Sequence, residues 1–142
     1  MSADVSEIMS AVKNRIEQIG ILKEVRVVEN QIIFGRLLDT VPDLTGYPAA
    51  LVCGGETLMK NGDVTCEVII DVIVIDQFFD ILGKTEESKK IMIKTRDLFA
   101  PALNGQLFSI NEYHFMIRGV ENIKLNPEHI AWNIKLTVFT SC

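Results

Sequence analysis

The sequence has few cysteines, no basic surplus and no long apolar run, and each of these absences argues against a class of protein. Its 3 cysteines among 142 residues include no CxxC spacing, so neither a disulfide framework nor a common zinc motif is predicted. No window approaches the roughly 18 uninterrupted apolar residues of a membrane-spanning helix; the longest candidate, Val68 to Ile75, contains Asp71. Lys and Arg number 14 against 19 Asp and Glu, which argues against a protein that neutralises nucleic-acid phosphates or anionic lipid.

The cysteines and the start of the chain indicate a compartment. Cys53, Cys66 and Cys142 are odd in number and lie in apolar or terminal settings, which favours buried reduced thiols over metal ligands. The first 22 residues mix charged and apolar side chains, unlike a secretory signal. We therefore expect a soluble protein, made in a reducing cytoplasm, whose mature chain begins at Met1 and has no membrane partner.

The composition is that of one globular domain. Apolar residues make up 48% of the chain and charged residues 23%, and a chain of this length buries enough surface to fold without metal or disulfide. Apolar residues recur at helical spacing from Val5 to Ile19, which predicts an amphipathic helix. Asp4 and Glu7 fit a capping box at its start, and Gly20 fits the left-handed residue that closes it.

A long hairpin is predicted next, after a short strand at Val25 to Val28. Two prolines and a glycine between Asp39 and Pro48 deny both helix and ladder geometry, so we predict a surface loop there. Ala49 to Cys53 reads as one strand of the hairpin and Val64 to Ile75, dense in Val and Ile, as the other. The Asn-Gly pair within Lys60 to Asp63 favours the turn between them.

The second half of the chain is again predicted to contain a helix followed by strands. Gly83 and Thr85 introduce a helix that ends near Phe99, ahead of Pro101. Strands follow at about 113–118 and 131–140, the last alternating apolar and polar residues. The inner stripe of the helix is predicted to be Ile91, Met92, Thr95, Leu98, Phe99 and Ala102.

This element order predicts a single α+β domain over residues 1–142, a mainly antiparallel β-sheet with two amphipathic helices packed on one face. Two helices cover one face only, yet the strand ending at Ile75 is apolar on both. Either neighbouring copies of the chain cover the remaining face, or the loop from Asp39 to Pro48 folds over it. On the first alternative the predicted subunit interface is Ile69, Asp71, Ile73, Phe78 and Phe79, while Val68, Ile70, Val72 and Val74 face the helices.

Few residues suggest catalysis. Glu112 and His114 alternate on one strand face and could form an acid–base pair, but without a nucleophile or metal such a pair is usually surface decoration. His129 falls in a turn, where an exposed polar residue is the default. Asp71, inside an apolar strand, could be a carboxylate with a raised pKa; contact with a cation or amide at a subunit interface is the favoured interpretation.

Two further patterns have ordinary explanations. Gly54 and Gly55 match neither dinucleotide-binding nor P-loop spacing, so we interpret them as the flexible base of the hairpin. The basic residues of the second helix share it with acidic ones, including the i,i+4 pair Glu86 and Lys90, which favours a solvated face over a DNA contact. These basic residues are Lys89, Lys90, Lys94 and Arg96.

The order of elements resembles one known family. After the N-terminal helix come the strand from Tyr47 to Val52 and a glycine-containing hairpin into Val68 to Ile75. A helix beginning near Glu86 and ending near Gly105 follows, and the strand from Trp132 to Thr140 closes the chain. This order is similar to that of the tail terminator, or tail-completion, proteins of long-tailed bacteriophages and related prophage particles.

The resemblance implies a structural role without catalytic residues or cofactors. Such a subunit forms a homo-oligomeric, hexameric ring that caps the tail tube protein, ends its polymerisation and presents a surface to the head connector protein. It would be found in the host cytoplasm during assembly and then at the head-proximal end of the virion tail. DNA would pass through without specific binding, which suits the negative charge, although no charged stripe is evident for the lumen.

Contact with the tube is predicted for the hairpin, because a strand-anchored arm can adapt its shape while its base stays fixed. Two alternatives remain: a head–tail connector or neck subunit, and a small ligand-binding or enzymatic domain with a pocket lined by Glu112, His114 and Asp71. The predicted tube-contact residues are Glu56, Leu58, Met59, Lys60, Asn61 and Asp63.

Overall fold

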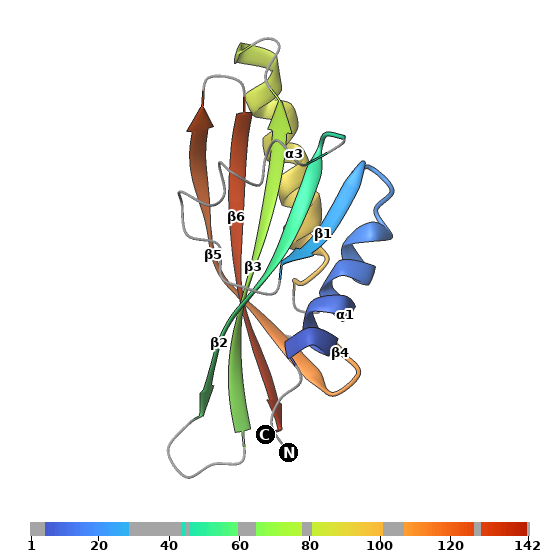
Figure 1. Cartoon of the computed structure of the whole chain (residues 1–142), viewed down its shortest axis with the longest axis vertical. Helices are drawn as coiled ribbons and strands as arrows, with labels where there is room; N and C mark the ends of the chain where they lie inside the picture. Colours follow the sequence, from blue (N-terminus) through green and yellow to red (C-terminus); the bar gives the residue numbers. More distant parts are fainter. Residues whose placement is uncertain are drawn as a thin grey trace.

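The computed structural model of the chain describes residues 5–28, 44, 46–59, 65–77, 81–100, 107–126 and 129–141. They form one curled six-stranded sheet and two helices (Figure 1). The elements in chain order are α1 (Val5–Glu17), β1 (Glu24–Val28), β2 (Ala49–Met59), β3 (Thr65–Gln77), α3 (Ile81–Asp97), β4 (Phe108–Ile110), β5 (Tyr113–Asn126) and β6 (His129–Ser141).

The sheet is mixed, with the strand order β1-β2-β3-β6-β5-β4. β1 runs parallel to β2, and the other four neighbouring pairs are antiparallel. The α+β class is therefore confirmed, while the sheet is not purely antiparallel. The segment 29–48 between β1 and β2 is long enough for the crossover connection that a parallel pair requires.

β3 lies in the middle of the sheet and fixes its register. It pairs with β6 along its whole length, from Thr65 opposite Ser141 to Gln77 opposite His129. Its other edge pairs with β2, with a bulge between Gly54 and Thr57. The predicted hairpin between β2 and β3 is confirmed, and both strands are longer than the sequence pattern indicates.

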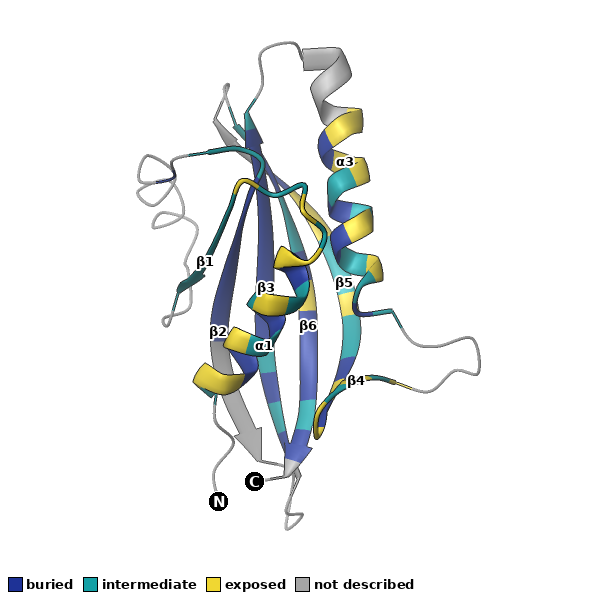
Figure 2. Ribbon diagram, turned by 90° about the vertical axis from the view of Figure 1, so that its right-hand side faces the viewer, coloured by how far each residue is buried: buried dark blue, intermediate teal, exposed yellow. Residues whose placement is uncertain are grey.

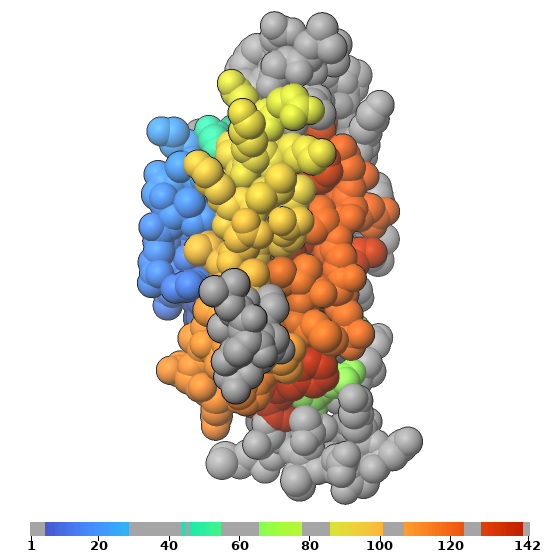
Figure 3. All heavy atoms as spheres, turned by 180° about the vertical axis from the view of Figure 1, so that it is seen from behind, coloured from blue at the N-terminus to red at the C-terminus, as the bar shows by residue number. Residues whose placement is uncertain are grey.

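Both helices bury their apolar stripes against one side of the sheet. Figure 2 shows α1 and α3 on the same side, and from behind α3 lies between α1 and β5 (Figure 3). The predicted facing of β3 is confirmed, since Val68, Ile70, Val72 and Val74 all belong to this cluster. The residues of the helical side buried there are Ile8, Met9, Val12 and Ile16 of α1, Met92 of α3 and Phe99 in the turn after α3.

The helix ends differ in how well the sequence predicts them. α1 ends at Glu17, and Gly20 has the predicted left-handed conformation, with a φ of 75°. α3 begins at Ile81, before the predicted start at Gly83 and Thr85. The predicted capping residue of α1, the predicted breaker of α3 and the last residue of its inner stripe (Asp4, Pro101 and Ala102) lie outside the described residues.

A second apolar cluster lies on the opposite side of the sheet. Leu44 is buried, with 8% of its surface exposed, and Tyr47 packs against the same cluster. Both belong to the segment predicted as a surface loop, so at this end the chain covers its own sheet. The strand residues of the cluster are Ala49, Leu51, Cys53, Ile73, Ile75, Ile123 and Ala131.

Gly54 permits the close approach of α1 to β2. A Cβ atom at this position would lie 2.5 Å from Met9 Sδ and 3.2 Å from a methyl of Val5. Its role is thus to clear space for the helix, which replaces the interpretation of a flexible hairpin base. Because Met9 is itself buried, the sulfur has little room to move.

Gly54→Ala is therefore expected to lower the free energy of unfolding by about 1–3 kcal/mol through overpacking. Urea denaturation followed by far-ultraviolet circular dichroism measures the change. Gly119→Ala is the matched control, because a Cβ at Gly119 meets no atom within 4 Å. Equal stability of the two variants would contradict the steric role of Gly54.

Candidate functional site

The side of the sheet away from the helices is divided into an apolar half and a polar half. Residues directly opposite on neighbouring strands point to the same face, so the register places Asp71 beside Cys53 and Lys135. On this side of the sheet, the side chains beyond the second apolar cluster are called the polar half-face. It comprises Ile69, Asp71, Glu121, Asn133, Lys135 and Thr137.

Asp71 is the half-buried carboxylate at the centre of the polar half-face. Burial raises the pKa of Asp71, while a side-chain hydrogen bond from Asn133 and the charge of Lys135 act in the opposite direction. The Lys135 ammonium also lies 3.4 Å from a carboxylate oxygen of Glu121. Lys135 therefore stabilises the charged forms of two carboxylates. At Asp71 the effect of burial is larger, so the charged form of Asp71 is less stable than it would be in water.

Two hydrogen-bonding groups of this face differ in whether they find a partner within the described part of the chain. The Asn133 side-chain oxygen is shielded from solvent and accepts no hydrogen bond there. A buried acceptor left unpaired costs about 1–3 kcal/mol. Thr137, in contrast, is buried and accepts a hydrogen bond of 2.8 Å from Arg118 Nε.

The cysteines give no reactive centre within the described residues. Cys53 is buried and free, and burial, followed by the charge of Asp71, raises the pKa of its thiol to about 12. The thiol stays protonated at neutral pH and is a poor nucleophile. The prediction of reduced thiols holds for Cys53 and is wrong for Cys66, which is disulfide-bonded. Cys142 lies outside the described residues.

The residues of the predicted subunit interface differ in burial. Ile73 belongs to the second apolar cluster and is 4% exposed, so it leaves little of its own surface for another subunit, and its place in an interface stays a prediction. Ile69 and Asp71 are half-buried and keep exposed surface. Phe78 and Phe79 lie outside the described residues.

The predicted tube-contact hairpin is an extension of the sheet. Its backbone at Glu56, Leu58 and Met59 belongs to β2. Pairing continues to the last of these residues, with Leu58 opposite Glu67 and Met59 opposite Cys66. The hairpin base is therefore fixed in the sheet, as predicted. The predicted tip residues Lys60, Asn61 and Asp63 lie outside the described residues.

The acid–base candidates do not converge on Asp71. Glu112 is exposed in the turn between β4 and β5, and His114 Nδ1 lies 2.6 Å from Ser109 Oγ across that hairpin. His114 lies opposite Phe139 of β6, whereas Asp71 lies opposite Lys135 of the same strand. The four residues between these two positions correspond to roughly 13 Å along the strand. The described residues thus form no common pocket of Glu112, His114 and Asp71.

His129 and the basic residues of α3, the remaining candidates, have contacts or exposure typical of residues without a catalytic role. The His129 ring packs against Tyr47, with ring centroids 5.3 Å apart. The basic residues of α3 are exposed or half-buried, and Nη2 of Arg96 lies 3.2 Å from Oδ1 of Asp97.

Among the described residues no group of three or more His, Cys, Asp and Glu side chains could hold a metal. Neither described helix has the length and apolar character that crossing a membrane requires.

The sequence matches no family model, and no curated protein aligns with it significantly. The surfaces of the chain itself, above all the polar half-face, are therefore what a function has to explain.

Proposed function

We propose that this chain is a structural subunit of a phage tail, a tail terminator. Six copies form a ring that caps the tail tube, ends its polymerisation and offers a surface to the head connector. The observation that carries the proposal is the polar half-face, a half-buried and incompletely satisfied sheet surface beside the apolar half, against which Leu44 and Tyr47 pack.

The polar half-face has the character of an incomplete interface. The charged form of Asp71 is less stable than in water, and the side-chain oxygen of Asn133 accepts no hydrogen bond from the described residues. A neighbouring subunit that brings N–H donors or a cation to this surface would satisfy both groups. Ile69 adds apolar area beside them. Contact with a second copy therefore relieves costs that the single chain bears.

Ring closure needs two different patches on each subunit, because a head-to-tail interface joins one surface to another. The polar half-face supplies one patch. We assign the second to the segment with Phe78 and Phe79, which the sequence marks as apolar. The net charge of −5 suits a passage through which DNA slides, since phosphate-binding Lys and Arg would retain it.

Shortening the hairpin tests the capping role. Replacing residues 60–63 by two glycines removes the tip and leaves the pairs Leu58–Glu67 and Met59–Cys66 able to form. We expect rings to persist, while negative-stain microscopy of tail tubes assembled with the variant shows uncapped tubes of uncontrolled length. The control is Asn111→Gly, which alters the β4–β5 turn. Normal capping by the shortened variant, or its failure to fold, would refute the assignment of the hairpin.

A further inference from the structure

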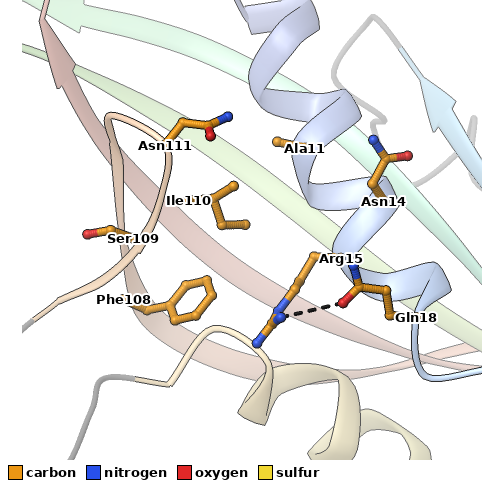
Figure 4. A pocket seen from close by; sticks show the side chains of 8 residues that line it. All are labelled: Ala11, Asn14, Arg15, Gln18, Phe108, Ser109, Ile110 and Asn111. Atoms are coloured by element: carbon orange, nitrogen blue, oxygen red, sulfur yellow. Dashed lines mark hydrogen bonds between the residues drawn. The ribbon is translucent and has the colours of Figure 1, made fainter.

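A groove runs between α1 and the β4 hairpin, away from the polar half-face. Figure 4 shows Asn14, Arg15 and Gln18 on the α1 side and Phe108 and Ser109 on the β4 side. The volume of the groove is about 440 Å³, which is in the range of sites for small molecules and short peptide segments.

Arg15 enters this groove with hydrogen-bonding capacity that the described part of the chain does not use. The guanidinium carbon lies 5.0 Å from the centroid of the Phe108 ring, and Nη1 donates a hydrogen bond of 3.4 Å to Gln18 Oε1. Nε is shielded from solvent and has no acceptor among the described residues, so a ligand would meet the terminal nitrogens instead. Stacking on Phe108 orients the guanidinium, and Nη2, which forms no hydrogen bond with a described residue, remains available to a ligand.

The charge of the groove is complementary to a carboxylate. Arg15 is its charged lining residue; the others are apolar or neutral polar side chains. No carboxylate within the described residues forms a salt bridge with Arg15, although the chain is acidic overall. Because guanidinium and carboxylate groups form paired, charge-assisted hydrogen bonds, an acidic ligand fits this site better than a neutral or basic one.

The backbone beside Arg15 favours an extended ligand. β4 is the last strand in the sheet order, and it pairs with β5 on one side only among the described strands. Ser109, at the centre of this short strand, lines the groove. An exposed strand edge binds extended peptides through main-chain hydrogen bonds, with specificity supplied by neighbouring side chains.

We propose that this groove binds an extended acidic segment of a partner protein. The segment lies along the edge of β4 that no described strand occupies, and an Asp or Glu side chain of the segment pairs with the Arg15 guanidinium. This site does not depend on ring formation, because it uses neither the polar half-face nor the β2–β3 hairpin.

The test is a titration of isotope-labelled protein with an acidic peptide, acetyl-Thr-Glu-Thr-Glu-Thr-amide, and with its Gln counterpart, followed by nuclear magnetic resonance. We expect the acidic peptide to bind about tenfold more tightly and to shift the signals of the Ser109 and Ile110 amides and of Arg15 Nε–H. Arg15→Gln should remove this preference, and Arg96→Gln, the matched control, should keep it. Arg15→Lys should keep part of it, because the charge remains without the planar fork.

Three results would overturn the proposal. Equal binding of the two peptides would exclude the carboxylate contact, and absence of binding by either at millimolar concentration would exclude the site. Glutarate bound as tightly as the acidic peptide would identify a site for small carboxylates and refute addition of a strand. A melting curve of Arg15→Gln distinguishes loss of the contact from loss of the fold.

Discussion

Phe99→Ala is expected to lower the free energy of unfolding by about 3–5 kcal/mol, the cost of emptying a well-packed aromatic site. Phe99 lies in the turn that follows α3 and is 0% exposed. Its ring centroid lies 5.5 Å from that of Phe115 and 6.1 Å from that of Phe108, the latter in an edge-to-face arrangement. Truncation therefore removes both buried area and two aromatic contacts that join α3 to the β4–β5 hairpin.

Urea denaturation of the wild type and of Phe99→Ala measures this loss of stability. Leu107→Ala is the control, because Leu107 precedes β4 and is 42% exposed; its effect should stay within about 0.5 kcal/mol. Because Phe108 packs on Phe99 and also stacks with Arg15, the signal of Arg15 Nε–H should change as well in Phe99→Ala. A loss below about 1 kcal/mol would contradict the packing described here.

Asp71→Asn is expected to stabilise the single chain at neutral pH and to weaken its assembly. The folded-state pKa of Asp71 is raised above its ordinary value of 3.8, so the folded state holds the proton more tightly than the unfolded state does. In the wild type the free energy of unfolding should therefore fall as the pH rises from about 3.8 through the folded pKa. The Asn variant should lack this contribution and melt at a higher temperature at pH 7.

Assembly should respond in the opposite direction. If a neighbouring subunit supplies a donor or cation to Asp71, the Asn variant should need about tenfold or more protein to reach half assembly, as measured by sedimentation velocity. Glu86→Gln, the same change at an exposed carboxyl on α3, should alter neither property. Unchanged assembly of Asp71→Asn would remove that residue from the interface.

Local patterns predicted the parts of the fold that depend on neighbouring residues. The period of two in β3 assigned Val68 and Ile73 to opposite faces, and both assignments agree with the two apolar clusters. The helical period and Gly20 marked α1 and its closure. These signals depend on side-chain spacing along the chain and need no knowledge of which strands meet.

Features that depend on distant contacts escaped prediction. The parallel pairing of β1 with β2 and the short strand β4 are set by the packing of the whole sheet. Ile73 has the same local pattern as Ile69, yet it is buried because it lies nearer the apolar half of the second face. Ser88 was missed in the inner stripe of α3 because it is polar; it is buried and accepts a hydrogen bond of 3.1 Å from Trp132 Nε1.

The residues of the candidate site likewise include some that local sequence predicts and some that only the pairing of strands reveals. Asp71 stands out in the sequence as an acidic residue within an apolar strand, whereas its partners Asn133 and Lys135 follow only from the β3–β6 register. The Arg15 groove gave no motif, because its two sides are far apart in the chain. The one available signal was an arginine next to Ile16, on the boundary between the apolar and polar sides of α1.

Whether copies of the chain assemble through the polar half-face is best measured by light scattering, which gives the mass of the purified chain over a range of concentrations. If copies of the chain complete the polar half-face, the mass should rise with concentration toward six times the 15.9 kDa of one chain. A constant mass of one chain up to near-millimolar concentration would contradict the claim.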